Sequence, residues 1–351
     1  MMSERNHEVT KVQPLLDKNG KLTEPGWSRK LYQVYDRSAI KAPAFRIKEW
    51  DYYLVMGKDF GLAFTISDDG YIGLQSVSLL DFTDSGNPWE HTNTILTPFP
   101  MGKMKMPSTT DKGNVSFHDK KLDLDFYKTE GQRSIVCNFK NFLDGKTLSC
   151  DIKLEEPDMD SLVIATPWAE KDTAFYYNRK INCMRASGSA FFNGKEYKFD
   201  PETDFGTLDW GRGVWTYDNT WYWSSGNGVV NGKPFGFNLG YGFGNTAAAS
   251  ENIIFYDGVG HKFDDIRFNI PEEADGTKNY MKPWTFTSSD GRFSADFVPV
   301  LDRAAKIDIK FIVTDQHQVF GKMSGKAVLD NGEVLEFKDL LCFAEDVHNK
   351  Y

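Results

Sequence analysis

The chain is made of short apolar segments that recur every ~8–12 residues and are separated by turn residues. One of them, VSFHDKKLDLDFYK, alternates apolar and polar residues around Leu122, Leu124 and Phe126, as a half-buried strand does. No segment keeps apolar residues at helical spacing over about three turns. The sequence therefore predicts an all-β fold of antiparallel barrels or sandwiches.

Two segments are similar enough to indicate an internal repeat. SGSAFFNGKEYKF begins at Ser187 and SGKAVLDNGEVLEF begins at Ser324, and both contain an Asn-Gly pair between apolar runs. Asn-Gly permits the positive φ angles of a tight hairpin turn. Asp209 follows the first hairpin, and Asp346 follows the second at nearly the same offset. Each copy would then close one β-domain, although unrelated hairpins can also look alike.

The length of 351 residues allows two β-domains of ordinary size. Residues 1–47 are polar and irregular but carry aromatic anchors such as Trp27 and Tyr35, which indicates a strap lying across the body of the protein. We expect a first β-barrel-like domain over residues 48–208 and a second over residues 209–351. An interface between two domains is a favoured location for a ligand site.

Charge and motif content argue against several function classes. The net charge of −9 disfavours a nucleic-acid partner, which would require a basic face. No segment approaches the ~20 apolar residues of a membrane span, and the N-terminal residues lack the apolar core of a signal peptide, so we expect a cytoplasmic protein. The histidines and cysteines lack zinc-ligand spacing, and no GxSxG or nucleotide-binding motif occurs in a suitable context. We therefore expect no metal, no cofactor and buried free thiols.

The stretch LDWGRGVWTYDNTWYWSSGNG, from Leu208 to Gly228, concentrates large rings around very few charges. Two interpretations remain open. In the first, the rings are core side chains, and Asp209 and Arg212 form a structural ion pair at a turn. In the second, the rings line a pocket and Asp209 is a desolvated acid, because burial raises the pKa of a carboxyl group and suits it to general-acid catalysis.

A second stretch, GKPFGFNLGYGFGN, interleaves glycines with aromatic residues. A nucleotide-binding glycine loop would need a helix after it, and none is predicted. The glycines instead indicate bulges or a close approach of the backbone to another group. The candidate substrate-binding residues of the two stretches are Trp210, Trp215, Tyr217, Trp221, Trp223, Asn238 and Tyr241.

The segment PWEHTNT supplies further candidates for catalysis. His91 has Glu90 beside it in a stretch, residues 89–107, that we expect to be a long loop or an edge covering a barrel mouth. A solvated loop histidine is the more common outcome, and a catalytic one is the alternative. The candidate catalytic residues are therefore Asp209 and Arg212, with Glu90 and His91 as additional candidates.

Several segments in order, GWSRKLYQVYD, KEWDYYLV, ISDDGYIG, LDWGRGVWTYDNTWYWSSG and FGFNLGYGFG, resemble the family known as domain of unknown function 2804. The resemblance covers nearly the whole chain from about Gly20, and the DWGRG run with its trailing Trp residues is its most specific element. The family has no assigned reaction, so the resemblance transfers no catalytic residue.

A more distant similarity is to the two-domain lipocalin-like proteins, which include carotenoid 1,2-hydratase and tocopherol cyclase. This similarity implies two β-barrel-like domains side by side and a pocket lined by aromatic residues. Asp209-Trp210-Gly211 stands where those proteins carry an Asp/His-Trp-Gly run, and the His that often precedes the Trp is absent here. Fold analogy alone is a weak guide to function.

Three functions fit these observations. The first is a cofactor-independent enzyme for hydration, cyclisation, isomerisation or elimination. In it, Asp209 protonates the substrate and Arg212 orients the acid or holds a substrate anion. The faces of Trp215, Tyr217, Trp221 and Trp223 stabilise a developing cation. The second is a carbohydrate-directed enzyme in which Asp209 works with another carboxylate. The third is a non-catalytic barrel that binds an apolar metabolite. All three predict a small-molecule partner, either apolar or a carbohydrate.

Overall fold

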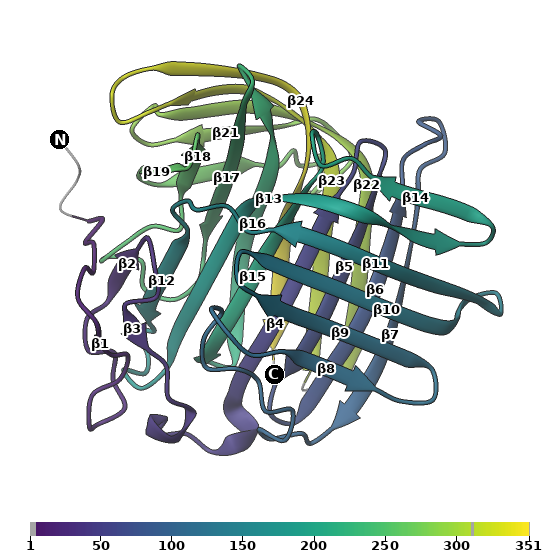
Figure 1. The fold of residues 1–351 in the computed structure, drawn as a ribbon. Coiled ribbons are helices and arrows are strands. Elements are labelled where there is room, and N and C mark those ends of the chain that lie inside the picture. The colour runs from purple at the N-terminus through teal and green to yellow at the C-terminus, as the bar shows by residue number, and fades with distance from the viewer. Residues whose placement is uncertain (1–4, 310–311, 351) are drawn as a thin grey trace.

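The computed structural model describes residues 5–309 and 312–350. It consists almost entirely of antiparallel strands in two curled sheets, which confirms the predicted all-β, lipocalin-like architecture (Figure 1). The helices among the described residues are the short 3-10 turns η1 (Arg37–Ala39) and η2 (Ala44–Arg46). No helix in this part of the chain is long or apolar enough to cross a membrane.

The first sheet has thirteen strands within the described residues. Along its main path the neighbouring strands are β7 (Trp89–Pro98), β6 (Ile72–Asp81), β5 (Phe60–Asp68), β4 (Ile47–Met56), β15 (Phe205–Val214), β13 (Phe175–Phe192), β11 (Lys146–Glu155), β10 (Gln132–Leu143), β9 (Leu122–Thr129) and β8 (Val115–His118). β12 (Leu162–Pro167) and β14 (Lys195–Phe199) pair with β13, and β2 (Gly26–Ser28) pairs with β12. The start of the segment expected to be a loop or an edge is thus edge strand β7, whose alternating exposure leaves one face towards solvent.

The second sheet has nine strands in the same part of the chain. In spatial order they are β19 (Val259–Lys262), β18 (Ile253–Tyr256), β17 (Lys233–Tyr241), β16 (Asp218–Val230), β24 (Val334–Lys350), β23 (Ile312–Val328), β22 (Phe293–Ile309), β21 (Trp284–Ser288) and β20 (Ile266–Asn269). The chain changes sheet between Val214 and Asp218. The whole of β15, including the part beyond the expected boundary at Leu208, therefore lies in the first sheet.

The strand orders of the two sheets correspond, as an internal repeat predicts. β4 to β7 extend from one side of β15 with β13 on its other side, and β16 to β19 extend in the same way from β24 with β23 beyond it. The predicted hairpins are confirmed: Asn-Gly turns join β13 to β14 and β23 to β24, and Gly194 and Gly332 have φ angles of 78° and 85°. In the second sheet, the single strand β24 pairs along the length of β23. In the first sheet, β14 and β15 together take the corresponding place beside β13.

The N-terminal residues form the expected strap. β1 (Gln13–Pro14) pairs in parallel with β3 (Gln33–Val34), and β2 adds to the first sheet through β12. Towards the second sheet, the backbone N–H of His7 donates to the carbonyl of Ala248 at 2.9 Å. Because Trp27 in β2 is buried, the strap is held by packing as well as by hydrogen bonds.

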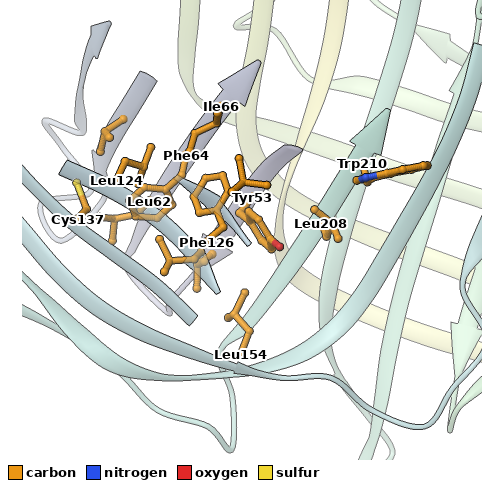
Figure 2. Close-up of a cluster of buried hydrophobic side chains, with 14 of the residues drawn as sticks. Tyr53, Leu62, Phe64, Ile66, Leu124, Phe126, Cys137, Leu154, Leu208 and Trp210 are labelled. Carbon is orange, nitrogen blue, oxygen red and sulfur yellow. The ribbon is translucent and has the colours of Figure 1, made fainter. Parts of the chain in front are cut away.

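Side-chain alternation divides the buried residues of β15 between two cores. Leu208, Trp210 and Val214 belong to the core of the first barrel, part of which is drawn in Figure 2. Asp209 and the glycines of the DWGRG run face the opposite way, towards the second sheet. A third core fills the space between the sheets and includes Trp215, Trp223, Phe243, Phe320 and Phe343. The four cysteines are buried and free, as predicted.

The interdomain face of β15 predicts a strong effect for a single added methyl group. A Cβ atom at Gly211 would lie 1.9 Å from the Trp50 ring, so Gly211→Ala must displace that indole. We expect a loss of about 3 kcal/mol in the free energy of unfolding, measured by urea denaturation. Gly86→Ala is the matched control, because its Cβ would meet nothing closer than 3.5 Å and should change stability by less than about 0.5 kcal/mol. Equal stability of the two variants would contradict the close packing of Trp50.

Candidate active site between the sheets

Asp209 lies at the centre of a buried polar cluster between the two sheets. Its Oδ1 accepts a hydrogen bond from Asn178 Nδ2 at 2.5 Å and lies 2.8 Å from Lys180 Nζ. Its Oδ2 accepts from Trp50 Nε1 at 3.1 Å. β15 pairs with β13 so that Asp209 is opposite Lys180, which explains why this lysine is its partner. Three donors therefore engage both oxygens of the carboxylate.

Lys180 links the first sheet to the second. Its side chain is 1% exposed, and its ammonium lies 3.8 Å from the centroid of the Trp223 ring. Asp209 and this aromatic face together compensate for the removal of the ammonium from water. Trp223 Nε1 in turn donates to Asn238 Oδ1 at 2.7 Å, and Asn238 Nδ2 donates to the Glu251 carbonyl at 2.8 Å. A continuous polar path thus runs from β15 to the segment before β18.

Glu251 is the least satisfied acid of this cluster. It is fully buried, and neither carboxyl oxygen makes a well-formed hydrogen bond with the described residues. Burial raises the pKa of Glu251 to about 7, while the Lys180 ammonium and the nearby Tyr176 hydroxyl act to lower it. Burial and the Glu251 charge raise the pKa of Tyr176 well above its ordinary value. Glu251 can therefore hold or release a proton near neutral pH.

The glycine-rich strand β17 makes room for this carboxyl group. Phe235, Phe237 and Leu239 point into the second barrel, and the residues between them face the first sheet. A Cβ atom at Gly240 would lie 2.8 Å from Glu251 Oε2. The structure thus agrees with the prediction that these glycines let another group approach the backbone closely.

Glu345 in β24 is the true counterpart of Asp209. It is opposite Trp223 in β16 and Gln318 in β23, as Asp209 is opposite Tyr52 and Lys180. Burial raises the pKa of Glu345 to about 7, against the lowering effect of the Arg303 charge and of the hydrogen bond from Gln318.

Asp346, suggested by the repeat as the equivalent acid, faces the interior of the second barrel instead. Its Oδ2 lies 2.5 Å from Lys278 Nζ and accepts from the Tyr280 hydroxyl at 3.0 Å. A shift of one residue in a strand moves a side chain to the other face.

Aromatic side chains enclose the polar cluster. The Trp215 ring lies at centroid distances of 5.3 Å from Trp221, 5.6 Å from Trp50 and 5.7 Å from Trp168. Tyr176 stacks on Phe243 at 4.8 Å. The structure thus brings Asp209, Trp215, Trp221, Trp223 and Asn238, five of the residues predicted from the sequence, into one interdomain site.

Arg212 and Trp210 lie on the opposite face of β15. Arg212 Nη2 bonds to Asp51 Oδ1 at 3.0 Å and to the Pro107 carbonyl at 2.8 Å, and its guanidinium covers the Trp210 ring at 4.2 Å. The expected contact of Arg212 with Asp209 is therefore wrong, because residues three apart in a strand point to opposite faces. Trp210 is a core residue of the first barrel.

The remaining candidates lie outside the cluster. Tyr241 stacks on Tyr222 at 4.4 Å against the second-barrel core, and Tyr217 is 47% exposed. Glu90 and His91 belong to β7, four strands from β15, or about 19 Å at the usual strand spacing. His91 Nε2 bonds to the Phe142 carbonyl at 3.0 Å.

Sequence reasoning missed Lys180, Glu251 and Glu345. Lys180 belongs to the polar triplet Asn178-Arg179-Lys180 in a strand that is buried along this length, and Glu251 is the charged residue between AAAS and the apolar strand Ile253–Tyr256. A charged residue in such a setting needs a buried partner, but only the strand pairing reveals which one.

The family model for the domain of unknown function DUF2804 matches residues 6–351. The chain belongs to this family. None of the curated proteins matches the sequence. Among solved structures, an AttH-type protein from Nitrosomonas europaea is similar, with a TM-score of 0.51 and 11% identity over 95% of this chain and 99% of that one. At this identity the likeness shows the fold alone.

Two further solved structures are similar to this chain at lower TM-scores. Kievitone hydratase from Nectria haematococca has a TM-score of 0.48 and 10% identity, and the match covers 97% of this chain and 98% of that one. CghA, solved with Sch210972, has a TM-score of 0.45 and 11% identity, covering 99% and 97%.

The raised pKa of Glu345 predicts how stability changes with pH. A buried carboxyl group that prefers its proton stabilises the fold below its ordinary pKa of 4.5, and this contribution is lost as the pH rises through about 7. Glu345→Gln should match the wild type near pH 5 and be more stable by up to roughly 3 kcal/mol near pH 8. Urea denaturation at both values measures the difference, with Glu336→Gln, at a 73% exposed side chain, as control. Parallel pH profiles of wild type and Glu345→Gln would contradict the assignment.

Proposed function

We propose that this family member is a cofactor-independent acid–base enzyme of the lyase, hydratase, cyclase or isomerase type, with its active site in the interdomain cluster. The observation that carries the proposal is the gathering there of buried polar atoms that make no well-formed hydrogen bond with the described residues: Asn178 Oδ1, Trp215 Nε1, Gln318 Oε1, and the Tyr176 hydroxyl and Glu251 carboxyl group, which interact with each other. Buried polar groups are nearly always satisfied in proteins, so such a cluster is explained by a ligand or by water.

In this proposal Glu251 takes the acid role that the sequence suggested for Asp209. A general acid works best with a pKa near the operating pH, and burial brings Glu251 to about 7. Asp209 pairs with Lys180, and both of its oxygens are occupied by donors.

The proposed chemistry begins with proton transfer from Glu251 to an alkene carbon or to a leaving hydroxyl or ether oxygen. The faces of Trp215, Trp221 and Trp223 then stabilise the positive charge on the substrate. Attack by water then completes an addition, attack by a nucleophile of the substrate itself completes a cyclisation, and loss of a neighbouring proton completes an elimination. In each case the proton released in this step returns to the Glu251 carboxylate. The enclosing rings favour a mainly apolar substrate.

The two other functions are less well supported. A carbohydrate-directed enzyme needs an ionised carboxylate free to act as nucleophile or base, and the oxygens of Asp209 are engaged by three donors. A non-catalytic binder would not need an acid with a pKa near neutral pH. Burial raises the pKa of both Glu251 and Glu345 to about 7. The close packing of Trp215 against Trp221 is the one feature that favours simple binding.

The test is a conversion screen. The wild type is incubated in H₂¹⁸O and in D₂O with a library of apolar alkenes, allylic alcohols and phenols, and mass spectrometry records addition or loss of water and deuterium uptake. We expect a conversion by the wild type that falls by at least about 10²-fold in Glu251→Gln, the usual contribution of a general acid. Asp209→Asn should reduce it as well, because Lys180 loses its counter-ion.

Two controls make the screen decisive. Glu333→Gln changes an exposed carboxyl group and should leave any conversion unaltered. Circular dichroism and urea denaturation establish that Glu251→Gln is folded. Full activity in a folded Glu251→Gln variant would remove Glu251 from the mechanism, and no conversion by the wild type across the library would favour the binding function.

A further inference from the structure

A cavity of about 470 Å³ lies beside the first barrel, between the N-terminal strap and the loop that follows β7. Its lining residues are Val34, Tyr35, Asp36, Arg37, Glu49, Gly102, Lys105, Met106 and Ser108. Glu49 in β4 is opposite Arg212 in β15, and both face the interior of the first barrel. The cavity is therefore separated from the interdomain cluster by the wall that β4 and β15 form.

The loop wall of the cavity is held in a defined position. The Asp68 carboxylate accepts backbone hydrogen bonds from Gly102 at 2.7 Å and from Met104 at 3.4 Å. Gly102 has a φ of 93°, and a Cβ atom there would lie 2.9 Å from Arg37 Nε. The loop thus packs tightly on the Arg37 guanidinium, as expected of a pre-formed wall.

The acceptors that line the cavity are already occupied. Glu49 pairs with Arg37 and accepts the Tyr35 hydroxyl at 2.8 Å. Asp36 accepts the backbone N–H and the hydroxyl of Ser38 at 2.8 and 2.7 Å. Neither carboxylate needs a cationic ligand for compensation.

The donors, in contrast, remain available. Within the described residues Lys105 makes no ion pair, the Ser108 hydroxyl makes no hydrogen bond, and Arg37 Nη2 is buried without a partner. Two cationic side chains and a hydroxyl therefore border a cavity whose other walls include Val34 and Met106. Lys and Arg are the usual donors to carboxylate groups.

We propose that this cavity binds a small organic anion, a carboxylate with an apolar body, at a site separate from the interdomain cluster. Lys105 and Arg37 face the carboxylate, Ser108 donates to it, and Val34 and Met106 contact the apolar part. The volume falls within the usual range of roughly 300–1,000 Å³ for ligand pockets.

The experiment compares octanoate, octan-1-ol and octylamine by isothermal titration calorimetry on the full chain. These probes share a chain length and differ in head-group charge. Octanoate should bind at least about tenfold more tightly than the other two, and its affinity should fall as salt is added. Equal affinity for the three probes, or no binding of octanoate, would overturn the proposal.

Single variants locate the binding. Lys105→Gln should weaken octanoate binding roughly tenfold, the value of one charged hydrogen bond. Lys103→Gln, in the same loop but outside the lining, should leave it unchanged. Unaltered binding in Lys105→Gln would show that octanoate occupies another place. Glu251→Gln should retain octanoate binding, so this test is independent of the proposed enzymatic function.

Discussion

The alternation of side chains along β15 is the constraint on which the rest of the structure depends. This strand is buried on both faces, so each residue is assigned to one of two environments with no solvent-facing choice. Asp209 and Gly211 face the second sheet, where the glycine leaves room for the Trp50 ring. Trp210 and Arg212 face the first barrel, where the guanidinium stacks on the indole. The DWGRG run therefore contributes to two separate environments, the polar cluster between the sheets and the core of the first barrel.

The cost of burying charge distinguishes the acids of the interdomain cluster that have partners from those that lack them. Removing a carboxylate and an ammonium from water costs several kcal/mol per ion unless hydrogen bonds and partners compensate. Lys180 and Asp209 receive that compensation from each other, from Asn178 and from the Trp223 face. Glu251 has no comparable set of donors, so it is stable there chiefly as a neutral acid at lower pH. The same buried volume thus maintains an ion pair and a protonatable acid side by side.

Local patterns predicted the fold well and the site only in part. Period-two alternation and Asn-Gly turns depend on neighbouring residues, so the all-β class and the hairpins follow from them, while the aromatic anchors Trp27 and Tyr35 indicated the strap. Of the residues predicted from the DWGRG stretch, Asp209 and three of the Trp residues lie in the interdomain cluster. Lys180, Glu251 and Glu345 come from other strands, and only sheet pairing and the packing of the two sheets bring them to Asp209. The repeat indicated Asp346, but the acid on the interdomain face is Glu345, one residue earlier.

The two proposed sites share the β4–β15 wall, and one residue touches the elements of both. Arg212 lies 3.9 Å from Glu49 in the cavity lining and donates to the Trp50 carbonyl at 2.8 Å. The indole of the same Trp50 donates to Asp209 on the other face. A ligand that drew Arg37 away from Glu49 would leave Arg212 as the main cation for that buried carboxylate. Arg212 therefore contacts both the carboxylate that lines the cavity and the backbone of the residue whose indole reaches Asp209.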